Sequence, residues 1–523
     1  MNLKRNKFSL SHHKLLSCRM GYLIPIGLLE VLPRDTIQHA TTGLVRCAPM
    51  VSPVMARVDV RIHHFFVPTR ILWNNWEDFI TGGPDGANDS VLPVVSSGAS
   101  GFAEGSLADY FGLPTGVPNL QVSALPFRAY NLIFNEYYRD EDLIDPVAIG
   151  DGDGSDTTTS LALQSCAWEK DYFTSARPWT QKGLGVSIPV NGSVSPPVAT
   201  LTPTADGVPS FVLATGDSGL GAQNLSITPQ QVSNGAVFGQ KQVPVNLLVS
   251  ANRDNYQMTG NLRWSNPALQ VSISGNTAAG FIDVNDLRLG LSLQRFQEAR
   301  ARYGSRYVEY LRYLGVISSD ARLQRPEYLA GGRSPLQFSE VLQTAEGENP
   351  VGEMRGHGIG ALRSNRYRRF IEEHGYIVTL MSIRPKTVYG QMLPRTWIRK
   401  TKEDFFQPEL QFVGQQEVYN KELSANASNP DGVFGYQDRY NEYRYHESSV
   451  AGEFRSTLDY WHMARKFSGN VALNGDFVTC NPTDRIFAAP GTSEAPNDTV
   501  YCFFHHSIQA RRMLAKVANP RII

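Results

Sequence analysis

The chain has 523 residues, and its 49 Lys and Arg balance 49 Asp and Glu, so no whole-molecule charge draws it to nucleic acid or to an anionic membrane. No apolar run reaches the roughly 18 residues of a membrane span, and the first residues lack the features of a secretory signal. The five scattered cysteines, with no CxxC pair, argue against a disulfide framework and a zinc site, and we expect synthesis in the cytoplasm.

Both ends of the chain are basic. No acidic residue precedes Glu30, and none follows Asp498. The amino-terminal basic residues are Lys4, Arg5, Lys7, Lys14 and Arg19, and the carboxyl-terminal ones are Arg511, Arg512, Lys516 and Arg521. Two interpretations stay open: these are solubilising tails, or they contact the phosphates of nucleic acid.

The first third of the chain predicts one strand and two helices. Residues 56–68 alternate between apolar and polar side chains up to a proline, which is typical of a half-buried strand. A short helix follows, with Trp73 and Trp76 on one face and a Gly pair at 82–83 that closes it. Residues 129–143 predict a second helix.

Residues 184–281 differ in composition from the rest of the chain. They are rich in Gly, Pro, Ser, Thr, Asn and Val, and short apolar stretches lie between turn signals. We expect a small β-rich insertion that is exposed on the surface. Its few charges suit packing against copies of itself or a neutral ligand.

The second half combines helices and buried strands. Apolar spacing predicts helices over 284–303 and 305–314, strands over 375–385 and 500–510, and a tyrosine-rich loop over 430–450. Strands separated by very long connections do not fit the regular alternation of a parallel α/β fold. The chain therefore predicts a mainly β protein whose long loops neighbouring subunits bury.

No motif commits the chain to catalysis or to a cofactor. Three His pairs, at 12–13, 63–64 and 505–506, suit structural or solvated roles, because neighbours on a strand point to opposite faces and cannot share a metal easily. The GHGIG at 356–360 lacks dinucleotide-binding spacing. Acidic runs at 140–142 and 151–153 suit solvated loops better than a calcium loop. We expect no catalytic residue, no metal and no cofactor.

One further cluster combines cations with aromatic rings. It comprises Arg363, Arg366, Tyr367, Arg368, Arg369 and Phe370. Such residues can hold phosphates while a ring stacks on a base. Arg and Tyr are also enriched where subunits meet. Both interpretations stay open.

Six multi-residue stretches together resemble the major capsid proteins of Microviridae, the small tailless single-stranded DNA bacteriophages, and particularly the gokushovirus-like branch. They include YLIPIGLLEVLPRDT and GYQDRYNEYRYHES, and lie in the same order at 22–36, 60–83, 125–143, 286–316, 320–334 and 435–448. The resemblance covers roughly 20–180 and 283–480. The insertion at 184–281 does not align with the family pattern, and the carboxyl end at 507–523 differs from the usual proline-rich ending.

The resemblance implies an eight-stranded antiparallel jelly roll with long inserted loops and short helices, the β-sandwich of many viral capsids. It also implies assembly into a T=1 icosahedral shell around circular single-stranded DNA, in the host bacterial cytoplasm. The expected organisation is a basic amino-terminal arm (1–29), a first jelly-roll part (30–183), the surface insertion (184–281), a second jelly-roll part (282–498), and a last strand with a basic tail (499–523).

The resemblance further implies a set of partners. They are copies of the chain at twofold, threefold and fivefold contacts, the packaged DNA, a small basic packaging protein, pilot and scaffolding-type phage proteins, and a host receptor met by the insertion near the threefold axes. The candidate DNA contacts are Lys4, Arg5, Lys7, Lys14 and Arg19, with the 363–369 cluster second. The alternatives are a carbohydrate-binding fibre or adhesin and, third, a glycoside hydrolase.

Overall fold

A computed structural model describes residues 5–183, 185–186, 284–304, 306–344, 350–467, 469–492 and 497–516, with five short strands between 198 and 274. Two compact units result, one from Met1–Leu184 with Arg295–Ile523 and one from Gly185–Gln294. The insertion expected at 184–281 lies mostly outside the described residues. Its described strands form two small antiparallel sheets: β8 (Val198–Pro203) with β12 (Leu269–Ser274), and β9 (Ser210–Leu213) with β10 (Asn224–Ser226) and β11 (Leu262–Trp264).

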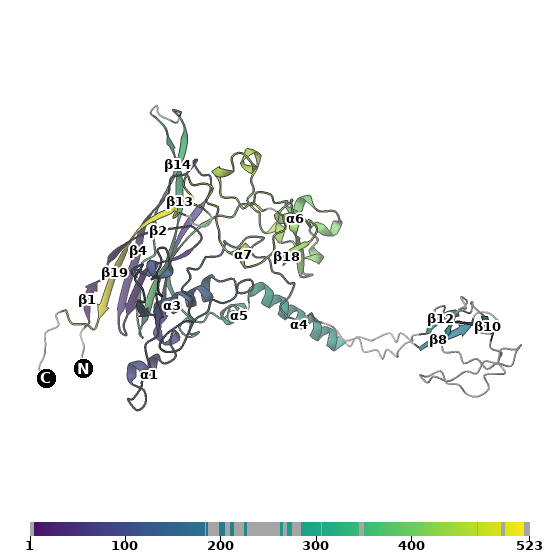
Figure 1. Ribbon diagram of the computed structural model, residues 1–523, viewed down its shortest axis with the longest axis horizontal. Coiled ribbons are helices and arrows are strands. Elements are labelled where there is room, and N and C mark those ends of the chain that lie inside the picture. Colours follow the sequence, from purple (N-terminus) through teal and green to yellow (C-terminus); the bar gives the residue numbers. More distant parts are fainter. Residues whose placement is uncertain are drawn as a thin grey trace. The chain divides into compact units, whose positions relative to one another are not determined.

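The large unit is built on one curled antiparallel sheet of ten strands (Figure 1). In path order these are β1 (Asn6–Ser9), β19 (Val500–Arg512), β4 (Thr36–Cys47), β14 (Met354–Arg363), β13 (Glu327–Leu342), β5 (Val58–Pro68), β16 (Gly375–Pro385) and β3 (Leu23–Val31), while β2 (His12–Cys18) pairs with β19 and β15 (Tyr367–Phe370) with β4. The mainly β expectation is confirmed. The sheet has ten strands where the jelly roll implied eight, because short strands such as β1 and β15 extend it.

The sheet folds into two facing layers because β13 changes layer along its length. Residues 327–336 of β13 pair with β5, and residues 337–342 pair with β14. The first layer thus contains β1, β2, β19, β4, β15 and β14, and the second contains β5, β16 and β3. His506 of β19 reaches the Ile26 carbonyl of β3 at 3.0 Å across the gap. A Cβ on Gly27 would lie 2.9 Å from that imidazole, so this approach requires glycine.

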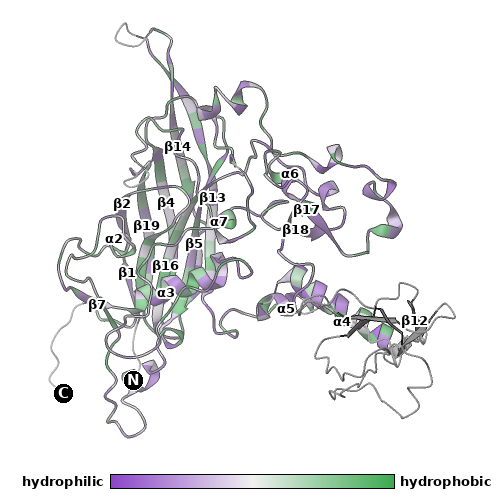
Figure 2. Cartoon of the chain, turned by 45° about the vertical axis from the view of Figure 1, so that its right-hand side comes forward, coloured by the Kyte–Doolittle hydropathy of each residue, from purple (hydrophilic) through white to green (hydrophobic). Residues whose placement is uncertain are grey.

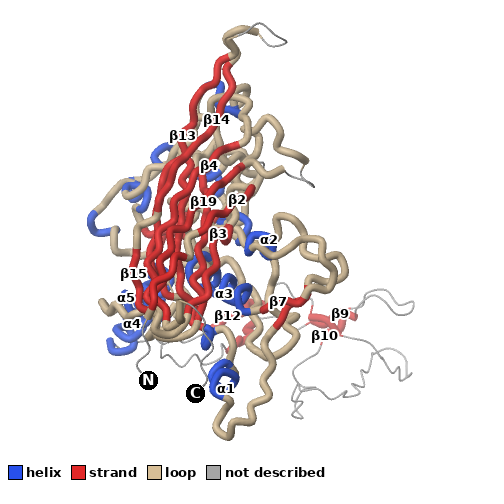
Figure 3. The backbone as a smooth tube through the Cα atoms, turned by 90° about the vertical axis from the view of Figure 1, so that its left-hand side faces the viewer, coloured by secondary structure: helices blue, strands red, loops and turns tan. Residues whose placement is uncertain are grey.

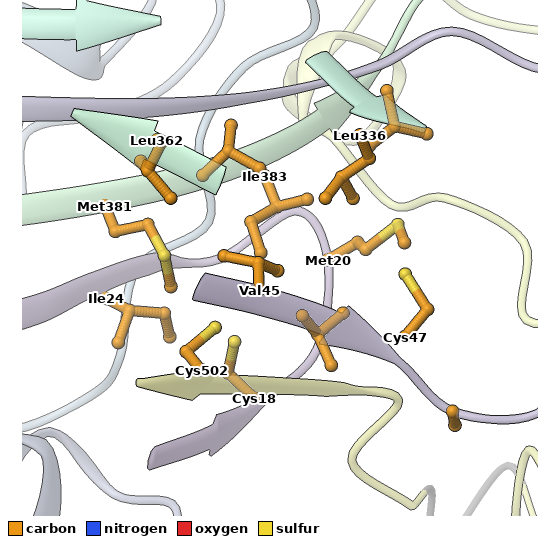
Figure 4. Packing of buried hydrophobic residues seen from close by; sticks show 14 of the residues in the cluster. Cys18, Met20, Ile24, Val45, Cys47, Leu336, Leu362, Met381, Ile383 and Cys502 are labelled. Carbon is orange, nitrogen blue, oxygen red and sulfur yellow. The ribbon is translucent and has the colours of Figure 1, made fainter. Parts of the chain in front are cut away.

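The space between the layers is filled by alternate side chains of both (Figure 4). Ile24 of β3, Val45 of β4, Ile383 of β16 and Cys502 of β19 all contribute. Hydrophobic residues, green in Figure 2, are concentrated in the strands of this sheet. Burial of this two-sided apolar surface is the main favourable term that holds the layers together. All five cysteines are buried and free.

The outer face of the second layer is covered. Helix α3 (Leu125–Ile133) and helix α2 (Leu107–Phe111) pack with long loops over Phe65 and Val378 of the sheet. A further core, around Phe173 and Phe434, lies among the loops before and after β17 and β18. The remaining elements are α1 (Trp76–Thr81), α4 (Val284–Tyr303), α5 (Tyr307–Tyr313), α6 (Asn420–Leu423), α7 (Gly475–Val478), β6 (Val94–Ser96), β7 (Gln121–Ser123), β17 (Gln415–Tyr419) and β18 (Val433–Asp438).

Several expected elements have the predicted bounds, and others differ. The helix over 284–303 and the strand over 375–385 are confirmed. The helix expected at 129–143 begins four residues earlier, since Pro126 fits its first turn, and it ends in a π-helical turn at Phe134–Tyr138. The strand over 56–68 is buried on both faces, because loops cover the side that was expected to face water.

The amino-terminal residues are integrated into the sheet. The interpretation of 1–29 as a basic arm is therefore wrong for the described residues from 5 onward. β1 and β2 pair with successive stretches of the same edge of β19, and β3 pairs with β16. The reason is the alternation in residues 12–18, which turns Lys14, Leu16 and Cys18 away from solvent.

Candidate nucleic-acid interface

The outer face of the first layer is the clearest candidate for a functional surface. On β19, residues 500, 502, 504, 506, 508 and 510 are buried, so the side chains at odd positions point outward. In Figure 3, β2, β19, β4 and β14 lie side by side, with β15 at their lower end. Helices α2 and α3 pack on the second layer instead.

Strand register brings basic residues from three parts of the chain together on this face. Lys7 of β1 pairs with Arg511 of β19, and Arg511 pairs with Thr36 of β4. Thr36 pairs in turn with Phe370 of β15, two residues beyond the exposed Arg368. We call Arg5, Lys7, Arg368, Phe370 and Arg511 the basic strip.

Arg5 completes the strip and is held in place by the sheet. Its guanidinium donates to the Arg34 carbonyl at 3.1 Å and to the Thr36 hydroxyl at 3.0 Å. It also lies over the Phe370 ring, 5.8 Å from the centroid. Such cation–π contacts leave most guanidinium donors free for another partner.

Within the described part of the chain, the cations of the strip have no acidic partner. Among the residues that the structure describes, no carboxylate lies within 4.0 Å of Arg5, Lys7, Arg368 or Arg511. Adjacent arginines differ: Arg512 pairs with Asp35 at 2.9 Å. Unpaired positive charge on an exposed strand face favours an anionic partner.

Three sequence candidates have other roles. The Lys14 ammonium donates to the carbonyls of Pro25 and Tyr110, and burial lowers the pKa of Lys14 to about 8. Arg19 pairs with Asp484 at 2.7 Å. Arg369 pairs with Glu327 at 2.8 Å. Arg19 and Arg369 are thus paired with carboxylates within the chain, and the donors of the Lys14 ammonium are taken up by backbone carbonyls, so these three residues do not belong to the strip.

The remaining candidates divide between the surface and the interior. Arg363 is exposed at the end of β14, on the same face as the strip, and Arg366 is exposed in the turn that follows. Tyr367 is buried, so its ring cannot stack on a base, and its hydroxyl lies 3.1 Å from His39 Nδ1. Lys4 lies outside the described residues. Sequence reasoning missed Arg46 on β4, whose outward position only the strand pairing shows.

A buried histidine cluster lies between the layers. His64 and His506 point inward and their neighbours outward, as expected for strands, and they meet His39, which the search for His pairs missed. His39 Nε2 lies 3.2 Å from His506 Nδ1, and Thr41 Oγ1 lies within 3.1 Å of both. Burial lowers the pKa of His39 to about 2, of His64 to about 3 and of His506 to about 4.

The described residues contain no group of three or more His, Cys, Asp or Glu that could hold a metal ion. The acidic runs are bound by other side chains: Asp140 contacts Lys170 and Arg177, and Asp153 accepts from Trp73. Within the described part of the chain, no helix is long and apolar enough to cross a membrane.

Comparison with known proteins agrees with the fold. The family described as "Capsid protein (F protein)" matches residues 1–520. "Capsid protein VP1" of Bdellovibrio phage phiMH2K is 38% identical over 92% of this chain and 89% of its own length. "Capsid protein VP1" of Chlamydia phage 1 is 36% identical over 93% and 91%, and that of Spiroplasma virus 4 is 29% identical over 96% and 93%.

These matches are those of structural proteins, and they confirm the resemblance to the major capsid proteins of Microviridae. They extend over the segments before and after the insertion, so they do not rest on a few short motifs. An adhesin or a glycoside hydrolase would not account for them. The chain belongs to the capsid protein (F protein) family.

Proposed function

We propose that the chain assembles into a T=1 icosahedral shell that encloses circular single-stranded DNA, with the basic strip on the inner surface and in contact with the DNA. The observation that carries this proposal is the convergence of Arg5, Lys7, Arg368 and Arg511 on one exposed face, where no described carboxylate lies within 4.0 Å of them. A chain of balanced overall charge needs such a local surface to hold phosphates. Contacts of this kind have little sequence specificity.

Exposed apolar residues support assembly with further copies of the chain. Ile317, Trp397 and Phe412 are each more than three-quarters exposed in the single chain. Monomeric proteins rarely leave large apolar side chains uncovered in numbers, and subunit contacts bury them. A closed shell requires both self-complementary twofold contacts and ring-forming contacts on each subunit.

We assign the remaining partners by the same reasoning. The strip alone neutralises few phosphates, so a small basic packaging protein supplies further positive charge, and pilot and scaffolding-type proteins complete the particle. The insertion at 184–281 contacts the host receptor near the threefold axes. The chain acts as a structural protein without enzymatic activity, is assembled in the host cytoplasm and is part of the virion.

Assembly is tested by expressing the chain alone and with the other structural genes of its phage, followed by electron microscopy. We expect uniform closed particles. Persistent monomers or trimers under both conditions would contradict the shell proposal. Deletion of 184–281 should leave particles intact and abolish adsorption to the host, whereas failure to form particles would assign the insertion a structural role.

DNA contact is tested with the triple variant Lys7→Gln, Arg368→Gln and Arg511→Gln. Particles of this variant should retain less nuclease-protected DNA and release it at lower salt. The matched control removes three exposed cations from the loops before β17 and after β18: Lys400→Gln, Lys402→Gln and Arg444→Gln. Equal DNA retention by the strip variant and wild type would refute the proposed contact.

A further inference from the structure

A row of aromatic side chains lies on the same face of β19 as the basic strip, beyond Ser507 and Gln509. Tyr501, Phe503 and His505 occupy successive outward positions, and Tyr501 and Phe503 are 49% and 40% exposed. Alternate residues on one strand lie about 6.6–6.8 Å apart, so the three rings form a regularly spaced series. A monomer gains nothing by exposing such rings, because burial of an aromatic side chain is strongly favourable.

Neighbouring strands extend this row. His13 of β2 pairs with His505, with ring centroids 4.6 Å apart, and it stacks on Phe503 at 5.3 Å. Leu15 pairs with Phe503 on the same side. We call His13, Tyr501, Phe503 and His505 the aromatic ladder.

Two cations border the ladder on its other side. Arg46 of β4 pairs with Tyr501, and Arg363 of β14 pairs with Thr42, which itself pairs with His505. Both arginines are exposed, and no described carboxylate lies within 4.0 Å of either. Across the strands, the rings of the ladder therefore lie next to guanidinium groups that have no described ion pair.

This combination restricts the chemistry of the partner. Unpaired guanidinium groups favour phosphates, which they bind through several parallel hydrogen bonds. Exposed rings at regular spacing favour a partner with a series of planar groups. The bases of a single strand are such groups and are free to stack on the rings, whereas the bases of a duplex are already stacked on one another. Charge complementarity thus favours single-stranded nucleic acid over an apolar protein segment, which would leave the arginines unpaired.

We infer that bases of single-stranded DNA stack on the aromatic ladder while the adjacent phosphates lie against Arg46 and Arg363. The inference rests on the proposed function, and it adds stacking to the phosphate contacts of the basic strip. Because every base has a π face, binding at the ladder tolerates any sequence. The strip and the ladder then lie on one face, over β1, β2, β19, β4, β14 and β15, with Ser507 and Gln509 of β19 between them.

The test measures binding of a fluorescent oligothymidylate to the full-length chain at several salt concentrations. In the ladder variant, Tyr501→Leu with Phe503→Leu, affinity should fall on the order of tenfold per ring, with little change in the salt dependence. The strip variant should instead reduce the slope of log affinity against log salt by about 0.7 for each phosphate that it no longer neutralises. A third variant, Tyr501→Phe with Phe503→Tyr, keeps both rings and should bind as wild type.

The outcomes separate the two proposals. If the ladder variant binds as tightly as wild type while the strip variant is weak, stacking is wrong and the proposed function stands; the ladder then covers a protein partner. If neither variant binds more weakly, both proposals fail. If the leucine variant melts at a lower temperature than wild type, ultraviolet crosslinking of bromouracil-substituted DNA to wild type decides: adducts at Tyr501 or Phe503 support stacking, and adducts confined to the basic strip overturn it.

Discussion

The arginines on the two outer faces of the sheet differ in whether they form ion pairs. On the second layer, Arg61 pairs with Glu169 at 2.9 Å, and Arg333 pairs with the buried Asp59. On the first layer, Arg368 and Arg511 have no described carboxylate partner and stay exposed. The difference shows where the chain compensates charge internally and where it leaves charge for another molecule.

The loops and helix that cover the second layer explain why the arginines on that face form ion pairs. Loops and α3 bury much of that face, including Asp59, and a buried carboxylate without a cation costs several kcal/mol. The first layer stays in contact with solvent, where an unpaired guanidinium has almost no such cost. Exposure to solvent therefore allows the strip cations to remain without ion pairs. Removing an arginine should lower the free energy of unfolding more on the covered face than on the exposed one.

The largest effect is expected at Arg128 on the covered side. Its side chain is 1% exposed and donates to Asp156 at 2.8 Å and to the Leu72 and Gly152 carbonyls at 3.0 Å. Arg128→Met leaves the buried Asp156 carboxylate without its cation and should lower the free energy of unfolding by about 3–5 kcal/mol. Urea unfolding measures this. Arg368→Met, the matched change on the uncovered face, should stay within about 0.5 kcal/mol, and similar effects of the two changes would contradict the comparison.

A second prediction concerns the histidine cluster between the layers. The folded pKa of His506 is about 4, below the ordinary value near 6.5, chiefly because of burial. The unfolded chain therefore binds protons first as pH falls, and stability is lost from about pH 6.5 down to about pH 4, by about 1.4 kcal/mol per pH unit for each such histidine. His12 and Lys14 face His506 and add to the shift in the same direction, as does His505.

The variant His506→Gln checks this prediction, because glutamine keeps polar atoms at the site and does not titrate. Between pH 6.5 and 5, the unfolding free energy of this variant should decline less steeply than that of wild type, by about one histidine's share. A pH dependence identical to that of wild type would exclude His506 as a contributor.

The smallest expected loss of stability distinguishes Arg512 from its neighbour Arg511 on β19. Arg512 is 17% exposed at its side chain and pairs with the buried Asp35, so Arg512→Gln should cost about 1–2 kcal/mol. Arg511 points to the uncovered face, so Arg511→Gln should leave the melting temperature unchanged and weaken DNA retention. Thermal unfolding and nuclease protection of the same two variants give both readouts. The reverse assignment would place the DNA contact elsewhere.

Local patterns predicted much of the fold. The strand over 375–385 and the helix over 284–303 have the predicted bounds because periodicity within each segment determines them. The candidate site was harder to predict, since Lys14 and Arg19 lie in the same basic amino-terminal segment as Arg5 and Lys7 and look equivalent in the sequence. Only the alternation of β2 and the position of Asp484 show that their charges are used internally.

Long-range pairing accounts for what the sequence could not predict. The basic strip and the aromatic ladder exist because β19 lies between β4 on one side and β1 and β2 on the other. His39 had no sequence signal, because its partners His64 and His506 come from strands distant in sequence. Such register follows from the folding of the whole sheet and not from any one segment.

The position of β19 has a consequence for the timing of synthesis. Asn6 donates to the Leu514 carbonyl at 2.8 Å across 508 residues. β19 is the last strand of the sheet to leave the ribosome, which at about 5–20 residues per second occurs roughly half a minute or more after β1. Until then neither the strip nor the ladder exists, so a nascent chain cannot capture nucleic acid on this face.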